Sequence, residues 1–230
     1  MTHRTWNLSE RIQHRLMLKS KLLSDVGLLN GKMGMAIVFG HLYKQTLNEV
    51  FDDCMSELVD NILETTYKGL DIGFSSGFSG IGWGIEYMIQ HGLVEGNGVE
   101  VCSELDLRIM EKDPRRITDL SLETGLEGLL HYVLAHLCGA IRQESQLPFD
   151  NTYLGDLYFS LKSRHQCDES STLNLLINEY TDWYNGTNTL DYHWNILSFI
   201  EPMEVDEKRI AEYPLGMRDG LSGVLLKQLL

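Results

Sequence analysis

One short phrase recurs along the chain, and it constrains the fold more than any other feature. Each copy contains an aliphatic residue, Gly or Ser, an apolar residue and two variable positions, and then ends in Gly-x-x-Gly. We call it the glycine phrase. Its copies are DVGLLNGKMG (25–34), DIGFSSGFSG (71–80), DLSLETGLEG (119–128) and PLGMRDGLSG (214–223). A phrase that returns at a regular distance predicts a repeat architecture.

The spacing of the closing glycines gives the length of the repeat. Gly34, Gly80, Gly128 and Gly223 follow one another at steps of 46, 48 and 95 residues, and the last step is close to two repeats. One copy has therefore decayed, and its expected place is near Thr172. We predict a single domain over residues 1–230 with five repeat units, which are 1–46, 47–92, 93–140, 141–186 and 187–230.

Each unit is predicted to be a pair of helices. Between Val50 and Leu63, apolar residues recur at three- and four-residue steps with acids between them, which is typical of an outer helix buried on one side. After each Gly-x-x-Gly the residues are apolar almost all round, as in IGWGIEYMI and LLHYVLAHL, which indicates an inner helix. Alternating outer and inner helices predict an all-α fold, an α/α toroid of about five hairpins.

The glycines let the backbone turn sharply and let neighbouring helices or a ligand approach closely. If the inner helices all begin at one rim, their N-termini point at a central mouth, where exposed N–H groups favour carboxylates. The mouth is therefore the predicted functional site. The structural glycines are Gly31, Gly34, Gly77, Gly80, Gly125, Gly128, Gly220 and Gly223.

Polar residues occupy most of the variable positions of the phrase, and they suit a peptide or a sugar ligand. The candidate ligand-binding residues are Asn30, Ser76, Glu123, Thr124, Arg218 and Asp219. Asn30, Ser76 and Thr124 can alternatively cap the helices that they precede. The aspartates that open three of the phrases are expected to fix the loop, and they are Asp25, Asp71 and Asp119.

Composition excludes several classes of function. The net charge of −14 argues against nucleic acid, because phosphate binding needs a clustered basic surface. Nowhere do eighteen apolar residues run together, so we expect no membrane span and a cytoplasmic protein. The four cysteines show no metal-binding spacing and are interpreted as reduced core residues. They are Cys54, Cys102, Cys138 and Cys167, of which the first two are expected at equivalent positions of outer helices.

The Gly-x-x-Gly openings, and GFSGIGWGIEYM in particular, resemble the lanthionine synthetase C-like family. The resemblance implies an α/α toroid, with seven hairpins in full members, and a central zinc that activates a peptide cysteine thiol for addition to a dehydrated residue. The family's zinc ligands occupy the two positions before the first glycine of the phrase. Here those positions hold Leu29 and Asn30, Ser75 and Ser76, Glu123 and Thr124, and Arg218 and Asp219. The resemblance therefore implies a member without zinc, without another cofactor and without cyclase activity.

Histidines offer no replacement zinc site in the sequence. His131 and His136 are five residues apart, which misses the i, i+4 spacing of a helical zinc pair. We interpret the histidines as hydrogen-bonded core or surface residues.

Three classes of function stay open. The first is a protein that binds a peptide or partner protein at the toroid mouth during peptide maturation. The second is a carbohydrate-active α/α toroid enzyme that uses Glu123 and Asp219 as an acid and base pair. The third is a purely structural interaction module.

The end of the chain is predicted to be the weakest wall of the ring. The last inner helix has only the residues from Gly223 to Leu230, and the preceding unit has lost its glycines. An open side would expose apolar residues and favour self-association through this C-terminal edge. The residues expected to be exposed are Leu225, Leu226, Leu229 and Leu230.

Overall fold

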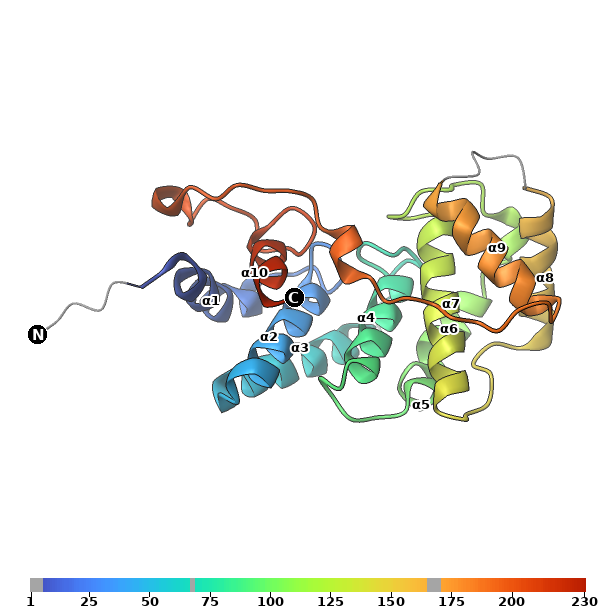
Figure 1. Cartoon of the computed structure of the whole chain (residues 1–230), viewed down its shortest axis with the longest axis horizontal. Helices are drawn as coiled ribbons and strands as arrows, with labels where there is room; N and C mark the ends of the chain where they lie inside the picture. Colours follow the sequence, from blue (N-terminus) through green and yellow to red (C-terminus); the bar gives the residue numbers. More distant parts are fainter. Residues whose placement is uncertain (1–5, 67–68, 165–170) are drawn as a thin grey trace, which may run out of the picture. The chain divides into compact units, whose positions relative to one another are not determined.

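The computed structural model describes residues 6–66, 69–164 and 171–230, and within these ranges the chain is helical and contains no strand (Figure 1). The predicted all-α class is confirmed. The α-helices are α1 (Leu8–Lys19), α2 (Lys32–Thr46), α3 (Glu49–Thr66), α4 (Phe78–Gln90), α5 (Gly98–Val101), α6 (Ser103–Met110), α7 (Leu126–Arg142), α8 (Asn151–Lys162), α9 (Thr172–Tyr184) and α10 (Leu221–Leu229). The 3-10 helices are η1 (Ser20–Leu22), η2 (Pro114–Arg116), η3 (Ile196–Phe199) and η4 (Glu207–Arg209).

Each glycine phrase ends at the start of a helix, as predicted. The first glycine of the closing motif is the N-cap of α2, α4, α7 and α10, with extended backbone in every case. The helices that follow are buried almost all round; every residue of α4 from Phe78 to Met88 is buried. By contrast, α3 alternates buried and exposed positions as an outer helix should. The expected helix at the decayed copy is α9, which begins at Thr172 and is capped by the Ser171 side chain.

All four phrases fold into the same loop. The first helical N–H donates to the carbonyl of the first phrase residue, from Lys32 to Asp25, Phe78 to Asp71, Leu126 to Asp119 and Leu221 to Pro214, at 2.8 to 3.0 Å. In three copies the second helical N–H also donates to the next loop carbonyl. These N–H groups are therefore already paired, and the expectation that they are exposed for a ligand is wrong.

The chain divides into two compact units. The first contains the chain up to residue 68 together with Asn195–Leu230, and the second spans Gly69–Trp194. In the first unit α3 packs along α2, and α10 packs against both α1 and α2. In the second unit α7 lies between α4 and α9, α6 packs on α4, and α8 packs on α9 and η2. The boundary falls inside the predicted repeat 47–92, between its outer and inner helices.

Neighbouring phrases are joined by backbone hydrogen bonds with the same register in both units. In the second unit the N–H groups of Phe74 and Ser75 donate to the carbonyl of Glu123 at 2.8 and 2.9 Å. In the first unit the N–H groups of Met217 and Arg218 both donate to the carbonyl of Leu29 at 2.8 Å. The fourth and fifth positions of one phrase thus pair with the fifth position of the next. The fourth phrase (214–223) therefore donates to the first (25–34) in the same register in which the second (71–80) donates to the third (119–128).

Ile200 and Glu201, which belong to no glycine phrase, take the position of a neighbouring phrase in this series of hydrogen-bonded loops. The N–H of Glu201 donates to the carbonyl of Arg218 at 2.7 Å, and a Cβ added at Gly223 would meet Ile200. In the same way, a Cβ added at Gly128 would meet Phe74, and one added at Gly34 would meet Met217. Ile200 and Glu201 therefore occupy the loop position before the last phrase. The predicted unit 187–230 has no outer α-helix among its residues, all of which are described, and contains only η3 and η4 before α10.

The expected apolar gap at the C-terminal edge is wrong for two of its four residues. Leu225 and Leu226 are fully buried, Leu229 is half-buried, and only Leu230 is exposed. The reason is that α1 and α2, from the other end of the chain, cover α10. Self-association through this edge stays a prediction, without support from these two side chains.

The cysteines match their predicted burial in part. Cys102 and Cys138 are buried, Cys54 is half-buried, and none of these three forms a disulfide. Cys54 lies within α3, whereas Cys102 lies at the junction of α5 and α6. Cys167 lies outside the described residues.

Candidate functional site

A cleft in the second unit lies at the loops of the second and third glycine phrases. Its volume is about 450 Å³. One wall contains phrase residues, and the other is the segment around η2 that leads into the third phrase. We call it the rim cleft, and its lining residues are Asp71, Ile72, Glu111, Lys112, Asp113, Arg116, Ile117, Thr118, Asp119 and Thr124.

The rim cleft carries four carboxylates and two basic side chains. Asp113 Oδ2 lies 3.5 Å from Arg116 Nε, and the Arg116 side chain is 87% exposed. Hydrogen bonds from the side chain and the N–H of Arg115 lower the pKa of Asp113. The cleft is therefore an anionic surface that also presents exposed cationic groups to solvent.

Asp119 is fixed inside its own loop. The hydroxyl of Thr124 donates to Asp119 Oδ2 at 2.5 Å, and the N–H of Ser121 donates to Oδ1 at 2.9 Å. These bonds lower the pKa of Asp119, and the bond from Thr124 has the largest effect. Asp25 accepts from the N–H of Gly27 at 2.7 Å in the same way. The predicted loop-fixing role of the aspartates is confirmed for Asp119 and Asp25, while Asp71 accepts from the adjacent N–H of Ile72.

The predicted ligand-binding residues fall into two groups, one in each unit. In the second unit the loop containing Ser76 is joined to the loop of Glu123 and Thr124, and Thr124 lines the rim cleft. In the first unit Asn30 lies against Gly216, and Arg218 Nε donates to Glu201 Oε1 at 3.0 Å. Asp219 is exposed in the first unit, so its pairing with Glu123 stays a prediction. The N-caps of α2, α4 and α7 are glycines, so Asn30, Ser76 and Thr124 each lie one residue before the cap, and the capping alternative for them stays a prediction.

Hydrogen bonds join the polar atoms of three ring-containing side chains within the second unit. Trp83 Nε1 donates to the Tyr192 hydroxyl at 2.7 Å, and that hydroxyl lies 2.8 Å from His131 Nδ1. Burial lowers the pKa of His131 to about 4, so the ring is neutral at neutral pH. Because the Tyr192 oxygen already accepts a hydrogen bond, its proton is available for Nδ1. The ring of Phe74, from the second phrase, packs on His131 with centroids 5.6 Å apart.

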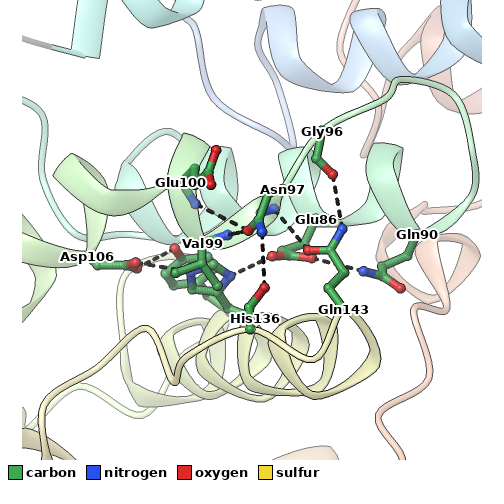
Figure 2. Close-up of polar contacts among 12 residues, drawn as sticks. Glu86, Gln90, Gly96, Asn97, Val99, Glu100, Asp106, His136 and Gln143 are labelled. Atoms are coloured by element: carbon green, nitrogen blue, oxygen red, sulfur yellow. Dashed lines mark hydrogen bonds and ion pairs between the residues drawn. The ribbon is translucent and has the colours of Figure 1, made fainter.

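A second, fully buried network joins three helices of the same unit, and Figure 2 shows its polar contacts. His136 Nδ1 on α7 lies 2.6 Å from Glu86 Oε1 on α4, and Nε2 lies 3.0 Å from Asp106 Oδ2 on α6. The Tyr132 hydroxyl donates to the other oxygen of Asp106 at 2.6 Å. Burial disfavours the charged imidazolium, but the hydrogen bonds to Asp106 and Glu86 outweigh it and raise the pKa of His136 to about 9.

Three glycines make room for this network. A Cβ added at Gly82 would overlap the Tyr132 ring, and one added at Gly98 or Gly139 would overlap the Glu86 carboxylate. The start of α5 is held against the end of α7, because the N–H of Gly98 donates to Gln143 Oε1 at 3.2 Å and Gln143 Nε2 donates to the Gly96 carbonyl at 3.0 Å (Figure 2). The side chains of Glu86 and His136 are both 0% exposed, so the network holds α4, α6 and α7 together and is closed to a substrate.

This network was not predicted from the sequence, although the sequence contains a signal for it. Glu86 is the one charged residue of α4, a helix that is otherwise apolar and glycine-rich. A charged side chain in a helix buried all round needs a buried partner, because an unpaired buried charge is very costly. His136, in the equally apolar α7, was the matching residue. The interpretation of both histidines as hydrogen-bonded core residues is confirmed.

No group of three or more His, Cys, Asp and Glu side chains within residues 6–66, 69–164 and 171–230 is arranged to hold a metal ion. No helix in the described part of the chain combines the length and the apolar character needed to cross a membrane. Comparison of the chain with protein-family models, with curated proteins and with solved structures gives no match.

Proposed function

We propose that this chain is a cytoplasmic, zinc-free member of the lanthionine synthetase C-like family that binds a peptide, free or as a segment of a partner protein, at the rim formed by its glycine phrases. The observation that carries the proposal is the rim cleft of about 450 Å³, lined by residues of the second and third phrases and by the segment around η2. Peptide maturation is the process in which such binding would serve, beside the enzymes that modify the peptide.

The proposed fold is an α/α toroid in which the phrases follow one another along one rim. Its support is the repeated backbone pairing, from Phe74 and Ser75 to Glu123 and from Met217 and Arg218 to Leu29. In a ring, the last repeat is the neighbour of the first, and the pairing of the fourth phrase with the first has the register expected of such neighbours. The N–H of Glu201 donates to the carbonyl of Arg218, which adds one more loop before the fourth phrase.

The chemistry of the rim cleft favours a peptide that contains basic residues. Four carboxylates outnumber the two basic side chains, and the chain as a whole carries a net charge of −14. Complementary charge raises the rate and the specificity of association. The volume lies in the range of sites that enclose a ligand of a few residues. Nucleic acid, which is polyanionic, would be repelled by the same surface.

Selection of random peptides displayed on phage tests the proposal. Peptides enriched on the immobilised chain are expected to be rich in Lys and Arg, and their affinity is then measured by fluorescence anisotropy. Glu111→Lys reverses a charge in the rim cleft, and Thr118→Trp fills it; each is expected to weaken binding by about tenfold. Glu104→Lys is the matched control, because Glu104 is exposed on α6 and does not line the cleft.

Equal affinity of the selected peptides for the wild type and both cleft variants would refute rim binding. The zinc-free part of the proposal is tested separately by elemental analysis of protein purified without added metal. One zinc ion per chain would contradict it.

A further inference from the structure

The outer face of α1 in the first unit combines exposed apolar and basic side chains. Trp6 is 46% exposed, Leu18 is 61% exposed, and Leu22 in η1 is 74% exposed. The buried side of the same helix, with Ile12 and Leu16, is already used inside the unit. Large apolar side chains that gather on one exposed face indicate an interaction surface.

This face is hollowed on both sides of an aromatic pair. The rings of Trp6 and His14 meet edge to face with centroids 4.7 Å apart. A cavity of about 290 Å³ lies on one side, lined by Trp6, Arg11, His14, Arg15, Leu18, Lys19 and Ile210. A second cavity of about 190 Å³ lies on the other side, lined by Trp6, Glu10, Gln13, His14 and Met17. A concave surface with an aromatic wall suits the insertion of single side chains.

The charge of the face is opposite to that of the chain. Residues 8–22 hold four of the 19 basic residues, Arg11, Arg15, Lys19 and Lys21, but only one of the 33 acidic ones. Lys21 is paired with Glu57 at 2.6 Å, and Arg11 lies 3.5 Å from Glu207. Arg15 donates to the carbonyls of Ala211 and Tyr213, and its buried Nε lacks a hydrogen-bond partner among the described residues. Because carbonyls do not neutralise a guanidinium, Arg15 contributes positive charge to the larger cavity.

We propose that the outer face of α1 binds an acidic peptide segment of a partner protein, which inserts a bulky apolar side chain between Trp6 and Leu18. The cationic groups of Arg15 and Lys19 attract the segment, and the cavity of about 290 Å³ takes its apolar anchor. The site is separate from the rim cleft and has the opposite charge preference. It would therefore distinguish the partner from the peptide held at the rim.

A basic face with Trp and Leu also has the chemistry of a helix that lies on an anionic membrane. Two observations favour the peptide. The face is hollowed, whereas a bilayer surface presents no side chain to fill a cavity. The net charge of −14 would also oppose the approach of the whole chain to anionic lipid.

Fluorescence anisotropy of a short labelled polyglutamate peptide with one central leucine tests the proposal on the full chain. Binding is expected at low salt and is expected to weaken in about 0.5 M NaCl, where charges are screened over a few ångströms. The same peptide without its leucine is expected to bind about tenfold more weakly, because the anchor no longer buries apolar surface. A polylysine peptide with one leucine is the charge control; it is expected to bind only at the rim cleft, so its affinity should be unchanged by Leu18→Asp.

Variants of the helix face locate the site. Leu18→Asp is expected to reduce the affinity by about tenfold or more, and Lys19→Glu by several-fold at low salt. Leu107→Asp on α6 and Lys162→Glu on α8 are the matched controls; Leu107 is 61% exposed, as Leu18 is. Unchanged circular dichroism shows that each variant is folded.

Several outcomes would overturn the proposal. Binding that is unaffected by Leu18→Asp and Lys19→Glu places the peptide elsewhere. Binding to phosphatidylserine vesicles without binding to the acidic peptide assigns the face to a membrane. Sedimentation that shows a dimer abolished by Leu18→Asp, again without peptide binding, assigns it to a second copy of the chain.

Discussion

Replacing Gly139 by Ala tests the buried network through an effect opposite to the usual one. Gly139 lies inside α7, where Ala is normally the better helix former by about 1 kcal/mol. Here the added Cβ would overlap the carboxylate of Glu86, which is fully buried and lies 2.6 Å from His136 Nδ1. Gly98 packs against the same carboxylate, so the group is confined between the two glycines, and Gly139→Ala is expected to push it away from His136 and break the ion pair.

The magnitude follows from two opposing terms. Breaking a buried ion pair and leaving one charge without its partner costs about 3–5 kcal/mol. The gain in helix propensity returns about 1 kcal/mol. The free energy of unfolding of the second unit should therefore fall by about 2–4 kcal/mol.

The assay is urea denaturation of the full chain, followed by circular dichroism, with Glu86→Ala as a second background. In the Glu86→Ala background the carboxylate is absent, so a Cβ at position 139 no longer overlaps it. Gly139→Ala should then stabilise by about 0.5–1 kcal/mol. Gly155→Ala in α8 is the control, since its Cβ would approach only the Tyr184 hydroxyl, at 3.2 Å. A stabilising Gly139→Ala in the wild type, or an equal cost in both backgrounds, would refute the reasoning.

Three further predictions concern stability. The pKa of His136 is raised from 6.5 to about 9, so its stabilising contribution is complete below about pH 6.5 and is lost as the pH rises through 9. The difference in unfolding free energy between wild type and His136→Gln should therefore shrink by about 3 kcal/mol between pH 6.5 and 9. Urea denaturation at each pH measures it. The lowered pKa of His131, about 4, has the opposite consequence: stability falls as the pH drops from 6.5 to 4, and His131→Phe should remove most of that acid sensitivity, which a thermal melt at each pH would reveal. Leu226→Asp places a carboxylate in a fully buried position and should destabilise the first unit by more than about 3 kcal/mol in thermal melts, whereas Leu230→Asp, at an exposed position, should change stability by less than about 0.5 kcal/mol.

Local sequence signals were enough to predict where the four helices after the glycine phrases begin, but they wrongly predicted an outer helix in unit 187–230. The glycine phrase marks the N-cap of α2, α4, α7 and α10, because the turn into each helix depends on residues within ten positions. Apolar periodicity likewise distinguished α3, which is buried on one side, from the helices that are buried almost all round. Both signals are carried by residues adjacent in sequence, so a single sequence contains them.

Contacts between distant residues could not be predicted in the same way. Glu86, Asp106 and His136 come from three helices, and no spacing rule joins residues 30 and 50 positions apart. Ile200 and Glu201 take the place of a glycine phrase through a backbone N–H, which any residue other than proline provides. Leu225 and Leu226 were expected at an open edge because the sequence does not show that α1 covers α10.

The central claim, that the rim of glycine phrases holds a peptide, is tested most directly by hydrogen exchange. The exchange of backbone amides in the full chain is measured by mass spectrometry with and without a saturating amount of a phage-selected peptide. Peptide binding is expected to slow exchange in residues 71–76 and 111–124, which contain the lining of the rim cleft. Peptide binding that leaves both segments unchanged, or that slows exchange only in α1, would contradict the claim.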